Sequence, residues 1–284
     1  MPELPEVETV RAGLVPHVVG KTIERADLLH SRVARMSEFG LEPVVGATIS
    51  AVVRRGKYLW MVTEAGALVA HLGMSGQFRI NSNSKHLRAR IHFTDGTALD
   101  FVDQRTFGHL HPDRLVATGD GGPGGMGSDL ALIPQSAAHI GRDLLDPHCD
   151  IYSVARQVKR GRTEIKRAML NQNIASGIGN IYADEALWEA RVHPKKITSA
   201  MTLTQIRDVY EAARDVMAAA LAVGGTSFDS LYVNVNGESG YFDRSLNVYG
   251  KTGCACERCG TQIERLVFMN RSSHVCPACQ RRSL

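Results

Sequence analysis

The 284-residue chain lacks any apolar run that approaches 18 residues, the length at which a segment becomes a candidate membrane span. Its start carries Glu3, Glu6 and Glu8 and lacks the basic stretch and apolar core of a secretory signal peptide. We find no internal repeat and no low-complexity tract. These absences predict a cytoplasmic protein without membrane contact, in which free thiols or thiolate–metal bonds are more expected than disulfides.

Aromatic residues are also scarce, at 6% of the chain, and they are not spaced along strands. This disfavours a protein that binds single-stranded nucleic acid by stacking bases. What is present is ordinary for a globular protein, with 44% hydrophobic and 22% charged residues. The net charge of +4 is concentrated from Lys251 onward, where the sequence has six Lys or Arg residues and two Glu residues. A small basic module on a neutral body indicates a polyanionic partner.

The first half of the chain has β-type periodicity after one helix. Residues 5–15 show the apolar spacing of an amphipathic helix that ends at Pro16 and Gly20. Short β-type runs then extend from Thr22 to about Val116, and Arg54-Arg55-Gly56-Lys57 is typical of a hairpin turn. Closely spaced strands without intervening helices predict an antiparallel β-sandwich. The clearest runs are Ile49–Val53, Tyr58–Val62, Ala67–Leu72, Phe78–Ile80, Ala89–Phe93 and Ala98–Val102.

The second half is helical. A glycine-rich loop at 120–128 and a linker from Pro134 to Pro147 separate it from the strands. Amphipathic segments follow near 151–159, 163–171, 181–191 and 202–222, and the last opens with the capping-box pattern Thr202-x-x-Gln205. The chain is therefore predicted to be an α+β protein with domains at 1–133, 147–247 and 248–284.

Four cysteines near the end predict a metal site. Cys256 and Cys259 form one pair with two residues between them, and Cys276 and Cys279 form another after sixteen residues. Four thiolates suit one tetrahedral, structural Zn²⁺, and the short hairpin between the pairs would depend on it for folding. Cys254 is a spare thiol that could compete with Cys256.

A glycine-rich turn, residues 172–180, separates two of the predicted helices. Its glycines allow close backbone approach to a bulky ligand, and Asn180 presents an amide at the start of the next helix, where N–H groups suit a phosphate. A plain helical hairpin is the alternative.

The N-terminus carries a candidate nucleophile. Removal of Met1 would leave Pro2 with a secondary amine that can form an iminium with a sugar carbon, and Glu3 could move protons for it. An α-amine is unprotonated at neutral pH far more often than a lysine is. The alternative is that Pro2 and Pro5 merely open a helix.

Several motifs together resemble the formamidopyrimidine-DNA glycosylase family. They are the start Pro2-Glu3-Leu4-Pro5-Glu6-Val7-Glu8-Thr9-Val10, the run Gly177-Ile178-Gly179-Asn180-Ile181-Tyr182-Ala183-Asp184-Glu185, and the four-cysteine end. His71-Leu72-Gly73-Met74 and Arg271 before the third cysteine fit the same family. The resemblance covers the whole chain and implies an N-terminal β-sandwich with flanking helices, a helix-two-turn-helix domain and a zinc finger.

The resemblance also implies an activity. The family removes oxidised purines, such as 8-oxoguanine and formamidopyrimidines, from duplex DNA in base excision repair, and it cuts the strand as an AP lyase by β,δ-elimination. By similarity, Pro2 attacks C1′ of the damaged nucleotide and Glu3 acts as general acid/base. Lys57 matches the lysine associated with the first elimination, and Arg271 matches the arginine associated with the second. Glu6 and Glu185 match family carboxylates whose roles are less clear.

Further residues match DNA contacts of the family. Met74 and Phe107, with Arg105, correspond to the triad that intercalates where the base is extruded. Without the motifs, Met74 and Phe107 would be assigned to the core, and His71 likewise. Residues expected to contact DNA are Lys57, His71, His86, Arg105, Arg162, Lys166, Asn180 and Arg271.

Some features depart from the family pattern or leave alternatives open. His109 and His111 replace a hydrophobic continuation, and the loop 120–128 is peculiar to this chain. A lesion-covering loop is expected within Ser227–Tyr241. We expect a nucleoid-associated monomer acting on duplex DNA with damaged bases. The alternatives are an endonuclease VIII-type glycosylase for oxidised pyrimidines and a non-catalytic zinc-finger DNA-binding protein.

Overall fold

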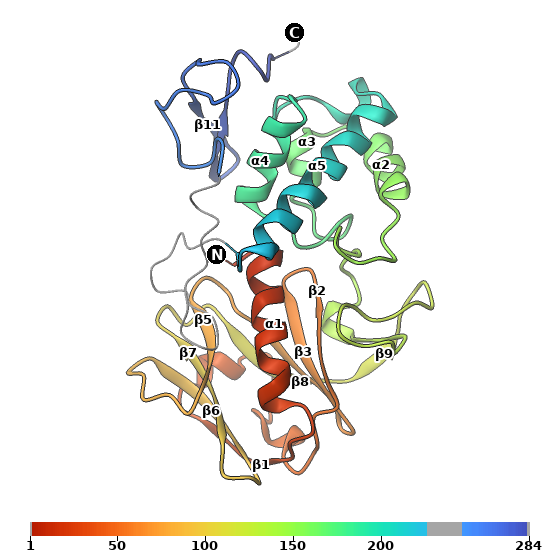
Figure 1. Ribbon diagram of the computed structural model, residues 1–284. Coiled ribbons are helices and arrows are strands. Elements are labelled where there is room, and N and C mark those ends of the chain that lie inside the picture. The colour runs from red at the N-terminus through yellow and green to blue at the C-terminus, as the bar shows by residue number, and fades with distance from the viewer. Residues whose placement is uncertain (1, 226–245, 283–284) are drawn as a thin grey trace. The chain divides into compact units, whose positions relative to one another are not determined.

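The structure, a computed structural model, describes residues 2–225 and 246–282 (Figure 1). The expected lesion-covering loop, Ser227–Tyr241, lies outside these residues. The described residues form two compact units, and the chain passes from the first to the second between His139 and Ile140. This point lies inside the predicted linker. The second unit contains the described parts of the predicted domains 147–247 and 248–284, except Val223–Gly225, which belong to the first unit.

The first unit begins with helix α1, Leu4–Val18. Pro5 lies in its first turn, where a missing N–H costs no helical hydrogen bond. The sequence predicts an end at Pro16, but the helix continues to Val18. Pro16 is tolerated because the Val19 N–H still donates to the Val15 carbonyl at 3.2 Å and Val18 is fully buried.

Two four-stranded antiparallel sheets confirm the predicted sandwich. One has the order β1-β6-β7-β5 and the other the order β2-β3-β4-β8. The strands of the first sheet are β1 Ile23–Leu28, β5 Gly76–Ile80, β6 Leu87–Phe93 and β7 Ala98–Asp103. Those of the second are β2 Ala51–Arg55, β3 Tyr58–Thr63, β4 Gly66–His71 and β8 His109–Asp113. β1 and β8 have no counterpart among the runs expected from the sequence.

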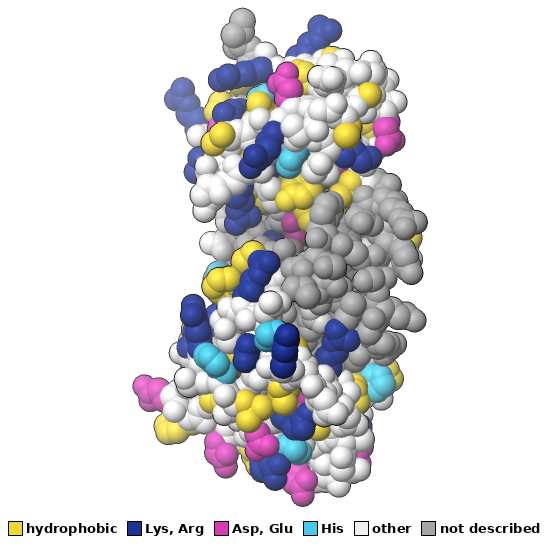
Figure 2. Space-filling view, turned by 90° about the vertical axis from the view of Figure 1, so that its left-hand side faces the viewer, with side chains coloured by type: hydrophobic (Ala, Val, Ile, Leu, Met, Phe, Trp, Pro, Cys, Tyr) yellow, Lys and Arg dark blue, Asp and Glu magenta, His cyan; other side chains and the backbone are white. Residues whose placement is uncertain are grey.

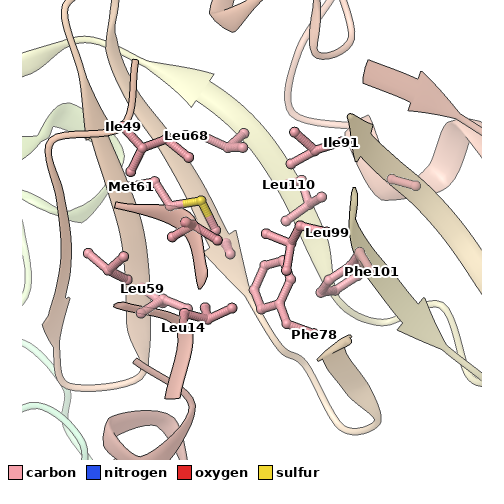
Figure 3. Close-up of a cluster of buried hydrophobic side chains, with 14 of the residues drawn as sticks. Leu14, Ile49, Leu59, Met61, Leu68, Phe78, Ile91, Leu99, Phe101 and Leu110 are labelled. Atoms are coloured by element: carbon pink, nitrogen blue, oxygen red, sulfur yellow. The ribbon is translucent and has the colours of Figure 1, made fainter. Parts of the chain in front are cut away.

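The core lies between the two sheets. Figure 3 shows side chains from both sheets directed toward one another, among them Leu68 and Leu110 from one and Ile91, Leu99 and Phe101 from the other. All five are at most 1% exposed. Leu14 of α1 joins the same cluster, so the helix that follows Pro2 and Glu3 is anchored in the sandwich core.

The glycine-rich loop packs against the sandwich. It lies between the short paired strands β9, Leu115–Ala117, and β10, Leu132–Pro134. Met126 exchanges two backbone hydrogen bonds with Arg54 of β2, at 2.9 and 3.0 Å. A Cβ on Gly125 would lie 2.3 Å from the Arg54 carbonyl oxygen, so this approach requires glycine. The loop therefore continues the sheet beyond β2.

The second unit contains four α-helices and a β-hairpin among its described residues. The helices are α2 Ile151–Arg160, α3 Ile165–Met169, α4 Asn180–Glu189 and α5 Leu203–Ala222, and the hairpin pairs β11 Glu264–Phe268 with β12 Arg271–Val275.

Short 3₁₀ turns occur in the first unit at Ser31–Ala34, Glu42–Val44 and Gln135–Ala137, and in the second at Thr198–Ala200.

The predicted capping box of α5 is confirmed, because Thr202 and Gln205 exchange hydrogen bonds of 3.0 and 3.1 Å. Within the described part of the chain, every helix is too short or too polar to cross a membrane.

Candidate functional site

Pro2 and Glu3 lie directly before α1 and are both buried. The Glu3 N–H donates a hydrogen bond of 2.8 Å to Oε2 of Glu6, and the Glu3 side chain accepts one from the Glu6 N–H. This reciprocal pair is a capping box, which satisfies N–H groups that a helix leaves unpaired at its start. The role of Glu6, left open by the sequence, is therefore to fix Glu3 and the residue before it.

Gly225 lies against this pair within the first unit. Its φ of +87° is in the left-handed region, and a Cβ there would lie 2.9 Å from Oε1 of Glu6. Only glycine combines that conformation with such close contact.

Lys57 occupies a two-residue turn between β2 and β3, as the sequence predicts. A buried ion pair supports this turn. Arg54, fully buried, donates from Nε to Glu8 Oε2 at 2.8 Å and from Nη1 to the Gly56 carbonyl at 3.2 Å. Glu8 thereby connects α1 to the Lys57 turn. Neither Arg54 nor Glu8 is predicted from the sequence as a supporting residue, although the consecutive arginines Arg54 and Arg55 were a signal.

His71 lies at the end of β4, opposite Tyr58 in register, so Lys57 lies at the same end of the sheet. Its Nδ1 accepts a hydrogen bond of 3.1 Å from the Gly73 N–H, which leaves Nε2 to carry the proton of the neutral ring. Burial, and then the charges of Lys57 and Arg35, lower the pKa of His71 to about 4. His71 is therefore a neutral N–H donor at pH 7.

The two unexpected histidines stack behind His71. The His71 and His109 rings lie 5.4 Å apart at 10°, and the His109 and His111 rings lie 5.4 Å apart at 28°. Burial, followed by the charges of His71 and Arg35, lowers the pKa of His109 to about 3. These histidines thus serve as flat, uncharged packing for the ring of His71.

Met74 and Phe107 are exposed, at 38% and 45%, and so is Arg105. All three lie on loops at one end of the sandwich strands, after β4 and β7. Arg35 donates to the carbonyls of Phe107 and Gly108 at 3.0 and 2.8 Å. The side chains of this predicted intercalating triad are thus exposed, and Arg35 fixes the backbone at Phe107 and Gly108.

His86 and Arg162 were predicted from the family positions alone. His86 is half-buried directly before β6, with Nδ1 3.4 Å from Nη2 of Arg88. Arg162 is exposed between α2 and α3. Lys and Arg side chains are exposed on both units on the face drawn in Figure 2.

In the second unit, Asn180 begins α4 after the glycine turn. The Gln172 side chain closes that turn by accepting from the Gly177 N–H at 2.9 Å and donating to the Ile178 carbonyl at 3.0 Å. Asn180 donates from Nδ2 to the Ser272 carbonyl at 3.0 Å, while its Oδ1 is buried without a hydrogen-bond partner among the described residues.

Lys166, an expected DNA contact, is buried in the second unit. Its ammonium is fully buried and donates to Asp184 Oδ1 at 2.7 Å and to the Ser272 carbonyl at 3.2 Å. Asp184 also accepts from Ser273 Oγ at 2.6 Å and from the His274 N–H at 2.9 Å. A buried ammonium needs a carboxylate, so Lys166 acts internally by attaching β12 to the helices.

Glu185 follows Asp184 in α4 and holds a different segment of the chain. Its carboxylate, 1% exposed, accepts the backbone N–H groups of Asn247, Val248 and Tyr249 at 2.8–2.9 Å. Burial raises the pKa of Glu185, and these hydrogen bonds oppose that effect. Glu185 therefore fixes the segment that leads into the four-cysteine module.

The four predicted zinc ligands come together. The Sγ atoms of Cys256, Cys259, Cys276 and Cys279 all lie within 4.8 Å of one another, with separations of 3.4 Å for Cys259–Cys276 and 3.5 Å for Cys259–Cys279. Four thiolates around Zn²⁺ at about 2.3 Å would be separated by about 3.8 Å, so the set fits zinc. Cys254 is exposed and is not part of this group.

Two residues connect the metal site to α4. Trp188 donates from its indole N–H to Cys256 Sγ at 3.4 Å, and the Arg258 guanidinium lies 3.8 Å from the Trp188 ring. From the same module, β12 begins at Arg271, which is exposed beside the hairpin turn. Metal binding and the Asp184 contacts thus fix the strand that presents Arg271.

Comparison with known proteins identifies this arrangement. Three family models match in order: the formamidopyrimidine-DNA glycosylase N-terminal domain over residues 1–110, the formamidopyrimidine-DNA glycosylase H2TH domain over 140–231, and the zinc finger found in FPG and IleRS over 255–282. A formamidopyrimidine-DNA glycosylase of Rhodococcus jostii is 51% identical over 297 residues, which cover 100% of this chain and 98% of the relative.

Solved structures agree over the full length. The crystal structure of the MutM (FPG) protein from Thermus thermophilus has a TM-score of 0.83 and 34% identity, covering 100% of both chains. The Lactococcus lactis FPG (MutM) in complex with a Fapy-dG containing DNA has a TM-score of 0.80 and 29% identity, covering 99% of this chain and 100% of that one.

Removing the metal should unfold the β11–β12 hairpin and spare the sandwich, because the hairpin is too small to bury its own core. The chain has two tryptophans, Trp188 beside Cys256 and the fully buried Trp60 of β3. We expect a chelator to change the fluorescence of Trp60→Phe, which retains Trp188, and to leave that of Trp188→Phe unchanged. An unchanged signal from Trp188 after metal loss would exclude a folding role for zinc.

His71 should make the first unit less stable in acid. Because its pKa of about 4 lies below the ordinary 6.5, the unfolded chain binds the proton first between these values. The free energy of unfolding then falls as pH drops from about 7 to 4, by up to about 1.4 kcal/mol per pH unit. His71→Gln should flatten this slope in urea titrations followed by Trp60. Equal slopes in wild type and His71→Gln would contradict a buried neutral ring.

Proposed function

The chain belongs to the formamidopyrimidine-DNA glycosylase family, and from that premise we propose how its residues divide the reaction and which lesions it removes. It is a base excision repair enzyme, a DNA glycosylase for damaged bases that, as is typical of the family, is also an AP lyase. Its zinc finger holds one structural Zn²⁺ through four cysteines.

The observation that carries our assignment is the buried capping box at the chain start. We assign Pro2 as the nucleophile: its nitrogen bonds to C1′ of the damaged nucleotide as the glycosidic bond breaks, the base leaves with the electron pair, and Glu3 takes up the proton that the amine loses. Glu3 then protonates the ring oxygen O4′, which opens the sugar and gives an iminium on the proline nitrogen. The hydrogen bonds between Glu3 and Glu6 support this geometry by fixing Glu3 at the N-terminal cap of α1.

Strand cleavage follows from the iminium. Loss of a proton from C2′ allows the 3′ phosphate to leave, and a second elimination releases the 5′ phosphate. We assign Lys57 to the first elimination and Arg271 to the second. The Arg54–Glu8 pair under the Lys57 turn and the Asp184 contacts behind β12 support these assignments, because they hold both cations in place.

The proposed phosphate contacts come from both units. The first contributes Lys57 and His71, and the second contributes Asn180 and Arg271. Such contacts position the duplex without reading its sequence. A neutral His71 with a proton on Nε2 suits a phosphate oxygen as acceptor. We retain His86, Arg105, Arg162 and the buried Lys166 as further proposed contacts.

We propose that oxidised purines are the preferred lesions. The Lactococcus lactis relative binds a Fapy-dG containing DNA, and Fapy-dG is a purine lesion. The opening Pro2-Glu3-Leu4-Pro5 and the pair Met74 and Phe107 favour the same class over oxidised pyrimidines. We further propose that the protein acts as a monomer on nucleoid DNA, with Met74, Arg105 and Phe107 filling the space left by the extruded base.

The nucleophile is tested by blocking its nitrogen. A chain with one uncleaved residue before Pro2 converts the amine to an amide and should give no borohydride-trapped adduct with any lesion, whereas the same extra residue at the C-terminus should have no effect. Trapping is measured on duplexes with 8-oxoguanine, an oxidised pyrimidine or no damage.

Preferential trapping on 8-oxoguanine supports the proposal. Preference for the pyrimidine lesion would select an endonuclease VIII-type specificity. Tight binding without an adduct on any duplex would indicate a DNA-binding protein without this chemistry.

Arg271→Ala should weaken DNA binding regardless of sequence and reduce the slope of log Kd against log salt by about 0.9, the effect of one lost phosphate contact. Fluorescence anisotropy at several salt concentrations measures this. Arg214→Ala is the matched control, because Arg214 of α5 pairs with Asp215. A slope shared by Arg271→Ala and wild type would remove Arg271 from the phosphate contacts.

A further inference from the structure

Asp103, the last residue of β7, collects hydrogen bonds from both loops that present the intercalating triad. It is fully buried. Its Oδ1 accepts from Ser75 Oγ at 2.5 Å and from the Arg105 N–H at 3.1 Å, and its Oδ2 accepts from the Gly108 N–H at 2.7 Å. Three donors thus converge on one carboxylate, which has no donor of its own when ionised.

These donors flank the exposed triad on each side. Ser75 follows Met74 directly, and Arg105 and Gly108 bracket Phe107. The two loops also touch through their backbones, since a Cβ on Gly73 would lie 2.6 Å from the Gly108 nitrogen. Asp103 therefore links two segments, 73–76 and 104–108, that are separate in sequence.

The loop 104–108 needs such a restraint. Thr106 has a φ of +54°, a left-handed conformation that is unusual for a β-branched residue. A strained residue of this kind persists only where its surroundings fix it. The hydrogen bonds to Asp103 on either side of Thr106, at Arg105 and Gly108, supply that restraint.

The backbone of Asp103 extends the connection to a third segment. Its N–H donates to the His86 carbonyl at 3.0 Å, and its carbonyl accepts from Arg88 Nε at 2.8 Å. Asp103 thus forms hydrogen bonds with the loops 73–76 and 104–108 and with the residue before β6, His86. These three segments carry the proposed DNA contacts at this end of the sandwich.

We propose that Asp103 is a positioning residue for base extrusion, which holds Met74, Arg105 and Phe107 as one rigid wedge. This inference rests on the proposed function, since a wedge is needed only where a base is taken out of a duplex. The carboxylate is specific for the role, because an amide in its place turns an NH₂ group toward N–H and O–H donors. The wedge would then lose its fixed shape while the chemistry at Pro2 remains intact.

The test compares two substrates in single-turnover experiments with Asp103→Asn. On a duplex with 8-oxoguanine, where the base must be extruded, we expect excision to slow by about 10- to 100-fold. On a single strand with a preformed abasic site, which has no base to extrude, borohydride trapping should change by less than about threefold. The rise in fluorescence of a 2-aminopurine placed next to the lesion should slow together with excision.

Asp100→Asn is the matched control. Asp100 lies on the same strand and is equally buried, but its carboxylate binds Arg90 Nε and the Ser82 N–H, both at 2.6 Å, and no wedge residue. Asp100→Asn should lower the melting temperature. The ratio of the 8-oxoguanine excision rate to the abasic-site trapping rate should stay within about twofold of wild type.

An Asp103→Asn ratio equal to that of wild type, or an equal loss on both substrates, would overturn the proposal. If Asp103→Asn does not fold, Ser75→Ala takes its place, because it removes one of the three donors. It must change the ratio in the same direction by a smaller factor. An unchanged ratio in Ser75→Ala would likewise overturn the proposal. A wild-type protein inactive on both substrates would instead refute the proposed function.

Discussion

The N-terminal residues of this chain are fixed by the hydrogen bonds that Glu3 and Glu6 exchange at the start of α1. Chain termini are usually frayed, but here the first turn is buried and Leu14 anchors the same helix in the sandwich core. Under the proposed assignment of Pro2 as the nucleophile, an amine held in this way needs little further ordering when a nucleotide arrives, which is how a positioned nucleophile gains rate. The glycine at 225 completes the arrangement by leaving room for Glu6.

Buried charges hold the other functional loops in the same manner. Arg54 and Glu8 support the turn that carries Lys57, and Lys166 and Asp184 hold β12 behind Arg271. Ion pairs of this kind add little net stability, whereas breaking one by removing a partner costs about 3–5 kcal/mol. Their contribution here is geometric, because each fixes a backbone segment that presents a cation to solvent.

Much of this could be predicted from sequence because its signals are local. The Gly56-Lys57 turn, the cysteine spacing and the Thr202–Gln205 capping box each depend on residues within one short segment, and the structure has all three. The family resemblance supplied chemical roles that composition and periodicity could not.

What could not be predicted depends on contacts between distant segments. The stacking of His109 on His71 follows from the pairing of β8 with β4, and β8 itself carries no clear strand pattern. The burial of Lys166 against Asp184 could not be predicted, because a motif shows the residue type and not its surroundings. Asp103 was not predicted from the sequence, because its three donors come from two loops that only the fold brings together.

The position of the covalent bond in the borohydride-trapped complex shows which nitrogen attacks C1′. Digestion and mass spectrometry should find the sugar remnant on a peptide that begins at Pro2, with Met1 absent. A trapped remnant on Lys57, or DNA cleavage by protein whose N-terminal peptide still begins at Met1, would contradict the central claim that the imino group of Pro2 is the nucleophile.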